Sequence, residues 1–513
     1  MTPQFHLARW NEPIVFELSE PGQRGLLPAP VEAELAAVVG PAEALVPAVA
    51  RRKTPAALPE VSQVRLRKHF LRLSQQTMGA AVGVDIGQGT ATMKYSPPVL
   101  DRISRRLADL HPLQNPATIR GLLDIVLRFE RVLCAISGLD RFSFQPGGGT
   151  HGIYANARII RAWHEHNGEG HRDEIITTLH SHSADAAAPR LAGFRIITLD
   201  PGPTGLPTVD DMRAVISDRT AGFVVVNPED TGLFNSAIAD LVAVVHEAGG
   251  LCAYDQANAN GMLGITRAAD AGFDLCQFNL HKTFGSPHGA GGLACGAIGV
   301  RTALAPFLPS PTIERDGDGV PYLDFARELS IGKMRAFYGA IDTVVRSYAW
   351  SLAQGAEGLR SVAETAVMNS NYLATRLRDD LGIDASFIEH SSLPRLEQVR
   401  YSLEAVLAGT GHGSEAISRR TVDFGVSGYF PGHHPWTVPE PMTLEPTESA
   451  THAEIDAYVE MLREVLREAH ENPVRIVASP ESTAIHLVDE ASLDDPTRWA
   501  LTWRVYLRKN NAL

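Results

Sequence analysis

The chain has 513 residues, and its 46 lysines and arginines against 59 aspartates and glutamates give a net charge of −13 at pH 7. This length exceeds what one hydrophobic core supports, so we expect two or three domains. The acidic balance and the lack of a basic cluster argue against nucleic-acid binding. No apolar stretch is long enough for a membrane span or a signal-peptide core, so we expect neither.

The four cysteines, Cys134, Cys252, Cys276 and Cys295, lack the paired spacing of zinc sites and redox motifs. They stand in apolar or Gly/Ala-rich surroundings, which are typical of reduced, packed thiols. The sequence therefore predicts a cytoplasmic protein without a metal site.

Residues 1–75 are rich in Pro and Ala and hold only short helical pieces, so we expect no independent core there. An extended arm that packs on another subunit is the better interpretation. The next segment, GQGTATMKYSPP at 87–98, places small and hydroxylated residues beside Lys94. That composition suits contact with an anion, but a plain turn with an exposed lysine explains it as well.

Two helices are expected next. Apolar residues recur with a helical period from Asn115 to Gly138, where the glycine ends the helix. FSFQPGGGTHGIYANARIIRAW then leads through a glycine cluster into a second helical run. Glycines directly before a helix let backbone N–H groups approach a phosphate, although a flexible turn has the same composition. The following stretch, residues 173–200, predicts a strand, a connecting helix and a second strand.

The clearest local pattern ends at Asp255. An apolar β-branched run at 223–226 precedes a helix that Asn235 or Ser236 can cap and that two glycines at 249–250 can close. A second apolar run, 251–254, follows directly. Strand, helix and strand over this length form a βαβ unit, which predicts a buried parallel sheet. Ligands of such sheets bind at the carboxyl ends of the strands, where Asp255 falls.

Asp255 and Lys282 together have the chemistry of a pyridoxal phosphate (PLP) site. A carboxylate at the end of a buried strand can hold the pyridine nitrogen protonated, and a lysine in a small-residue loop can form the Schiff base. The same pair occurs in many α/β proteins as a helix cap and a solvated charge. By themselves, the two residues leave both interpretations open.

The string NLHKTFGSPHGAGGLACGAIGV, residues 279–300, closely resembles the Schiff-base segment of the P-protein of the glycine cleavage system, a glycine decarboxylase. Further segments resemble that family in its order: PIVFELSEPGQRG, GQGTATMKYSPP, GGGTHGIYA, HSHSADAAAPRLAGF and DFGVSGYFPGHHPWTVPEPMTLEPTE. The length is similar to that of the second subunit of two-chain P-proteins. The resemblance implies the α/β fold type I of PLP-dependent transferases (aspartate aminotransferase superfamily). An N-terminal arm (1–75), a large PLP-binding domain (76–330) and a smaller C-terminal α+β domain (331–513) are expected.

The resemblance also implies site residues. Catalytic roles fall on Lys282, on Asp255 and on His182, whose ring would stack on the cofactor. Further cofactor contacts fall on Ala257, Asn258, Gly149, Thr150, His151 and His281. Candidates for the substrate entrance or a subunit interface are Thr90, Thr92, Lys94, Thr283 and His288. For Asn258 an Asx turn is an equally good interpretation, and His180 competes with His182 for the stacking position.

By resemblance, the chain is a subunit of glycine decarboxylase, which decarboxylates glycine and passes the aminomethyl group to the lipoylated H-protein. It should pair with a first subunit as an α2β2 assembly, or form a homodimer. The chain departs from the family at 86–88, at His151, where the family has Gln, and at Ile153, where it has Glu. These departures keep open a diverged PLP enzyme for another small amino acid or for specialised biosynthesis. A non-catalytic scaffold subunit is a third interpretation, against which the presence of both Asp255 and Lys282 argues.

Overall fold

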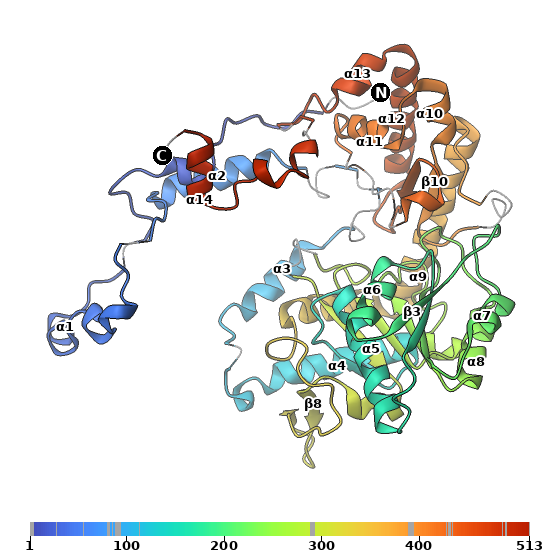
Figure 1. Cartoon of the computed structure of the whole chain (residues 1–513), viewed down its shortest axis with the longest axis horizontal. Helices are drawn as coiled ribbons and strands as arrows, with labels where there is room; N and C mark the ends of the chain where they lie inside the picture. Colours follow the sequence, from blue (N-terminus) through green and yellow to red (C-terminus); the bar gives the residue numbers. More distant parts are fainter. Residues whose placement is uncertain are drawn as a thin grey trace. The chain divides into compact units, whose positions relative to one another are not determined.

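The structure is a computed structural model (Figure 1), and it describes residues 5–26, 28–54, 56–78, 83–84, 86–87, 94–111, 113–287, 293–387, 394–426, 428, 432, 434–484, 486–487 and 490–511. Its contacts divide the chain into two compact units. The larger holds Ala80–Thr421 and Val426–Val477, and the smaller holds Pro3–Gly79, Val422–Gly425 and Ala478–Leu513. The domain boundaries predicted near residues 75 and 330 stay predictions.

A seven-stranded sheet forms the centre of the larger unit, in the order β1-β7-β6-β5-β4-β2-β3. The parallel part consists of β6, β5, β4, β2 and β3, while β7 runs antiparallel to both β6 and β1. The strands are β1 (Arg141–Ser143), β2 (Glu174–Thr178), β3 (Arg195–Leu199), β4 (Thr220–Val226), β5 (Leu251–Gln256), β6 (Leu275–Asn279) and β7 (Gly296–Val300). The parallel pairing of β4 with β5 confirms the predicted βαβ unit.

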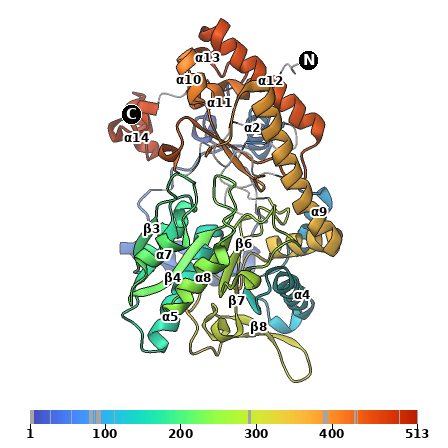
Figure 2. The same ribbon diagram turned by 90° about the vertical axis from the view of Figure 1, so that its right-hand side faces the viewer.

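Helices cover both faces of this sheet. On one face α5 (Gly149–His166) and α6 (Ser183–Leu191) enclose an apolar core, and on the other face α4 (Arg120–Ser137), α7 (Val209–Val215), α8 (Ile238–Glu247) and part of α9 enclose a second one. Because side chains alternate along a strand, Phe223 and Val225 of β4 enter the second core and Val224 enters the first. Figure 2 shows β4, β6 and β7 among these helices.

The helix ends follow the predicted glycines. Helix α4 ends at Gly138, which has a φ of 72° and donates its N–H to the Cys134 carbonyl. After α8, Gly249 takes a φ of 85°, as predicted for the closing pair. The start of α8 differs from the prediction that Asn235 or Ser236 caps it, because Ala237 is the N-cap residue. The Asn235 side chain instead accepts a hydrogen bond from the Ala237 N–H, just before the helix begins.

The C-terminal part of the larger unit begins with α9 (Ile341–Leu381), in which Gly355 has a non-helical φ of 65°. Beyond it a two-stranded antiparallel sheet, β10 (Val399–Ser402) with β11 (Pro441–Leu444), carries α10 (Glu404–Thr410), α11 (Ser414–Val422) and α12 (His452–Glu471). These three helices gather around β10 in Figure 1. Remaining elements are α3 (Pro98–Ser104), α13 (Pro473–Ala478) and the hairpin of β8 (Thr312–Arg315) and β9 (Pro321–Asp324).

The smaller unit combines the N-terminal arm with the end of the chain. It contains α1 (Ala33–Val39), which buries no residue, α2 (Gln63–Gln75) and α14 (Trp503–Lys509). The Phe16 ring stacks on Trp503 with 5.0 Å between centroids, and the Tyr506 hydroxyl donates to Glu17 at 2.7 Å. Among the described residues, no helix is both long and apolar enough to cross a membrane.

Candidate active site

A cavity of about 400 Å³ lies where β5 and β6 end, and most of the predicted site residues line it. The predicted residues in its wall are Gly149, Thr150, His151, His182, Asp255, Ala257, His281 and Lys282. Gly147, Gly148, Ile153, Asn279 and Ala294 complete the lining. Residues from five separate stretches of the chain therefore meet at the carboxyl edge of the parallel strands, where α/β sheets bind ligands.

The glycine cluster forms one wall, because α5 starts there. Gly148 is the N-cap residue of α5 and offers no side-chain cap, so the helix N-terminus faces the cavity with its partial positive charge. A Cβ on Gly149 would come within 2.8 Å of the Asn279 amide nitrogen. Any larger residue at this position would therefore have to displace the Asn279 side chain, which also lines the cavity.

His151 lies in the first turn of α5 and accepts a hydrogen bond from the Gly147 N–H at 3.1 Å through Nδ1. Burial, followed by the nearby Arg335 guanidinium, lowers the pKa of His151. The imidazole is therefore neutral at physiological pH, and Arg335 is the cation beside this end of the cavity.

Asp255 forms the floor of the site on β5 and is buried. Its Oδ1 accepts the Ala257 N–H at 2.8 Å and a short hydrogen bond from the Gln277 side chain. Burial raises the pKa of Asp255, and the two donors and the Lys282 amine oppose that rise. A buried carboxylate held in this way has a strong preference for a cationic partner.

Lys282 lies in the turn that follows β6. Its backbone N–H donates a hydrogen bond to the Asn279 carbonyl at 3.0 Å. The neighbouring His281 accepts the Cys295 N–H at 3.2 Å, which connects this turn to the residue directly before β7. His182 is the N-cap residue of α6, and its Nδ1 accepts the Ala184 N–H at 3.0 Å. A neutral His182 therefore carries its proton on Nε2.

Other candidates lie outside the cavity lining. The Asn258 side chain donates to Glu445, and the Thr283 hydroxyl accepts the Ala259 N–H at 2.9 Å. Thr90, Thr92 and His288 fall outside the described residues.

Lys94 is also placed away from the cavity, in a polar cluster of its own. Its amine contacts Glu448 at 2.7 Å and the Thr283 carbonyl at 2.6 Å, and it lies 4.7 Å from the Trp350 ring centroid. Burial lowers the pKa of Lys94, against the opposing effects of Glu448 and Glu445. The exposed lysine of the plain-turn interpretation is thus wrong.

Four residues with evident roles at the site were not predicted. Asn279 and Gln277 lie on β6, whose apolar pattern gave no reason to single them out. Arg335 influences the pKa of His151, and Asp185 influences that of Asp255. In both cases the two residues are far apart in the sequence. For Asp185, a carboxylate inside an alanine-rich helix is the one local clue.

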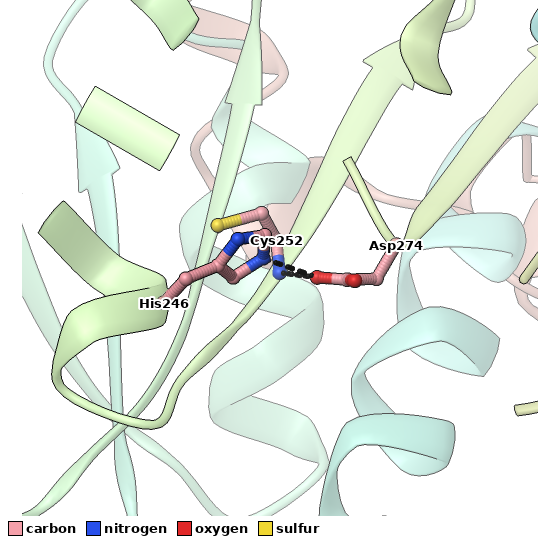
Figure 3. A group of neighbouring side chains, drawn as sticks. All are labelled: His246, Cys252 and Asp274. Carbon is pink, nitrogen blue, oxygen red and sulfur yellow. Dashed lines mark hydrogen bonds and ion pairs between the residues drawn. The ribbon is translucent and has the colours of Figure 1, made fainter. Parts of the chain in front are cut away.

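A second cluster, away from the cavity lining, has side chains of metal-binding type (Figure 3). Asp274 Oδ2 accepts hydrogen bonds from His246 Nε2 and from the Cys252 N–H, both at 2.8 Å. Cys252 offers its backbone N–H rather than its thiol to the carboxylate, and burial raises the pKa of that thiol well above its usual value. A protonated thiol is a poor metal ligand, so we interpret the cluster as a hydrogen-bonded group that connects α8 and β5 to the residue before β6.

Comparison with known proteins agrees with this geometry. A model of the aminotransferase class-V family matches residues 147–314, and a model of the glycine dehydrogenase C-terminal domain matches residues 362–483. The crystal structure of an inhibitor-bound glycine decarboxylase (P-protein) of the glycine cleavage system superposes with a TM-score of 0.71 at 19% identity, covering 86% of this chain and 100% of that one. A cysteine desulfurase from Escherichia coli gives 0.57 at 15% identity, covering 76% and 96%. Fold and site together define a PLP-dependent enzyme of fold type I.

Whole-chain relatives identify the family. A protein of Pyrococcus horikoshii named "Probable glycine dehydrogenase (decarboxylating) subunit 2" is 36% identical over 509 residues, 98% of each chain. Proteins with the same name from Pyrococcus furiosus and Caldanaerobacter subterraneus subsp. tengcongensis are each 37% identical, over 98% and 95% of this chain and 98% of their own. The chain belongs to the glycine dehydrogenase (decarboxylating) subunit 2 family.

Proposed function

We propose that this chain is the PLP-bearing subunit of a glycine decarboxylase, which removes the carboxylate of glycine and passes the aminomethyl group to a lipoylated H-protein. The observation that carries the proposal is the cavity in which Asp255, Lys282 and the glycine-rich start of α5 meet. These are the three groups that a planar, anionic, aldehyde-bearing cofactor requires.

The residues of the cavity fit PLP. Lys282 would hold the cofactor covalently through its amine, and Asp255 would hold a proton on the ring nitrogen. His182, on the N-terminus of α6, would cover one face of the ring. When bound, PLP supplies a ring that accepts the electrons left behind when the substrate loses CO2. Because Asp255 is buried, its carboxylate would interact strongly with a cationic ring bound beside it.

The phosphate would bind at the start of α5. The backbone N–H groups of Gly149 and Thr150 and the Thr150 hydroxyl are donors at a helix N-terminus. The Arg335 guanidinium adds a full positive charge nearby. His151, held neutral, contributes hydrogen bonding rather than charge to this end of the site.

The remaining lining explains a preference for a small substrate. Ala257 and Ala294 bring only small, apolar side chains to the cavity wall. A wall of apolar side chains would disfavour substrates with larger or polar side chains, and each methylene so excluded is worth about 1–3 kcal/mol in selectivity. This supports glycine as the substrate.

A first subunit and the lipoylated H-protein are the proposed partners, in an α2β2 assembly or in a homodimer. The names of the relatives as subunit 2 support a partner subunit in a two-subunit enzyme. The cytoplasmic location stays a prediction from the sequence.

A second candidate function is a diverged PLP enzyme for another small amino acid. Ile153 and His151 favour it, because both line the cavity and both differ from the family pattern. The two functions share the cofactor site and differ in the substrate and partners that they use.

The test is the visible absorption spectrum of the purified chain with PLP, before and after glycine, with and without a first subunit and lipoylated H-protein. The cofactor band should be lost in Lys282→Ala and kept in the matched control Lys53→Ala, whose side chain is exposed. A band that changes with glycine when partners are present supports the decarboxylase. A lysine-dependent band that ignores glycine under every condition points to the diverged enzyme, and a chain that binds no PLP contradicts both.

A further inference from the structure

Asp255 has a second carboxyl group beside it. Asp185, the third residue of α6, is fully buried, and its side chain interacts with that of Asp255 across the gap between α6 and β5. The same helix carries His182 at its N-cap, which lines the cavity. The carboxyl pair therefore adjoins the proposed cofactor site: Asp255 lines the cavity, and Asp185 does not.

The surroundings of the two carboxyl groups are unequal. Asp255 accepts hydrogen bonds from the Ala257 N–H and from the Gln277 side chain. Among the described residues, neither side-chain oxygen of Asp185 has a donor within hydrogen-bonding geometry. Two adjacent buried carboxyls cannot both ionise without a large cost, so one proton is shared between them. The group without donors keeps the proton, and the group with donors stays ionised.

Two other groups influence Asp185: the Asp230 carboxylate, which follows β4, and the Ser181 hydroxyl in the turn before α6. Burial, then Asp255, then Asp230 raise the pKa of Asp185 well above its usual value, whereas Ser181, the smallest of these influences, lowers it. Asp230 itself is paired with the buried Arg400 guanidinium at 3.1 Å.

We propose that Asp185 is a positioning residue that stays protonated and donates a hydrogen bond to Asp255, which keeps Asp255 ionised and fixed in orientation toward the cavity. The inference rests on the proposed role of Asp255 in holding the protonated ring nitrogen. Asp185 acts through Asp255, and it adds a third donor to the two that Asp255 already has.

The first test uses the protein without cofactor. The infrared difference spectrum between the wild type and Asp185→Asn should contain the carbonyl band of a protonated carboxylic acid, sensitive to deuterium exchange. Asp240→Asn, which changes an exposed carboxylate on α8, is the matched control. Its difference spectrum against the wild type should not contain the carbonyl band of a protonated carboxylic acid. If the Asp185→Asn variant keeps the same protonated-carboxyl band as the wild type, so that the difference spectrum lacks it, the proposal is overturned.

Unfolding against pH gives an independent readout. A carboxyl that binds its proton more tightly in the folded state makes the protein less stable as pH rises between its unfolded and folded pKa values, by up to about tenfold in the unfolding equilibrium per pH unit. Asp185→Asn removes this titration, so its melting temperature relative to the wild type should rise with pH from about 4 upward. If the difference in melting temperature between Asp185→Asn and the wild type does not change with pH, the proton is not on Asp185.

Cofactor titration then tests the link to Asp255. Asn at 185 still offers an N–H donor, so Asp185→Asn should bind PLP within about twofold of the wild type, whereas Asp185→Ala should bind about tenfold or more weakly because Asp255 loses a donor. Equal binding by the Ala variant overturns the positioning role. If the wild type binds no PLP, the proposed function fails, while the infrared and pH results still decide where the proton lies.

Discussion

Gly296 shows how a residue outside the cavity lining controls the cofactor site. It is the first residue of β7, and its N–H donates to the Pro146 carbonyl at 2.9 Å, just before the glycine cluster. A Cβ added at Gly296 would lie 2.7 Å from the Gly148 carbonyl oxygen and 3.2 Å from the Gly148 carbonyl carbon. Real Cβ atoms essentially never approach within 3.0 Å, so Gly296→Ala must displace the loop by at least 0.3 Å (3.0 − 2.7).

The displaced atoms are backbone atoms of the α5 N-cap, which cannot rotate away as a side chain can. We expect overpacking to cost about 1–3 kcal/mol of folding free energy. The shift also misplaces the donors proposed for the phosphate, so the dissociation constant for PLP should rise about tenfold or more. The assays are thermal unfolding without cofactor and fluorescence titration with PLP.

Gly121→Ala is the matched control. Gly121 lies in the first turn of α4, where an added Cβ meets nothing within 4 Å. Alanine should stabilise this helix by about 0.5–1 kcal/mol and leave PLP binding unchanged. If Gly296→Ala binds PLP as tightly as Gly121→Ala does, the glycine loop is not held in place by β7 and the reasoning is refuted.

Three further changes test Asp255 and two buried groups outside the cavity lining, Glu397 and Lys94. Burial raises the pKa of Glu397 to about 8 from its ordinary 4.5. Between these two pH values the folded state binds one more proton than the unfolded state, so the folding stability falls as pH rises, by up to about 1.4 kcal/mol per pH unit. Glu397→Gln should therefore gain in melting temperature over the wild type between pH 5 and pH 8 (about the range set by those values), and a constant difference would refute it. Lys94→Met should cost about 3 kcal/mol because it leaves Glu448 half-buried without its cation, and Lys94→Met with Glu448→Gln should recover part of that loss in denaturant unfolding. Asp255→Asn should weaken PLP binding about tenfold or more, whereas equal binding by equilibrium titration would remove Asp255 from its proposed role.

Local patterns were enough to predict the strands β2 to β5 and the helices α4, α5, α6 and α8, but not β1, β6, β7 or α7. Helical periodicity and a closing glycine located α4, and two apolar runs on either side of a helical pattern located α8 between β4 and β5. The hairpin of β8 and β9 was missed, although its turn contains the pairs Asp316-Gly317 and Asp318-Gly319, which are common between paired strands. Both strands are only four residues long, so their apolar pattern is too short to indicate a strand.

The composition of the cavity wall could be predicted only where a motif is continuous in sequence. Gly149 to His151 and His281-Lys282 come as short strings, so the resemblance carried them together. Asn258 and Lys94 were expected near cofactor or substrate, yet their side chains pair with Glu445 and Glu448, far along the chain. No local pattern links residues so distant, because the pairing depends on how the two parts of the larger unit fold against each other.

This long-range pairing has a consequence for the order of folding. The seven-stranded sheet is complete at Val300, but Asn258 and Lys94 reach their carboxylate partners only when Glu445 and Glu448 have been added. Glu445 lies 187 residues beyond Asn258. Before that point the chain would hold all seven strands and Lys282, but Lys94 and Asn258 would lack their carboxylate partners. The cavity wall ends with Ala294, so it is synthesised well before the carboxylates that hold Lys94 and Asn258.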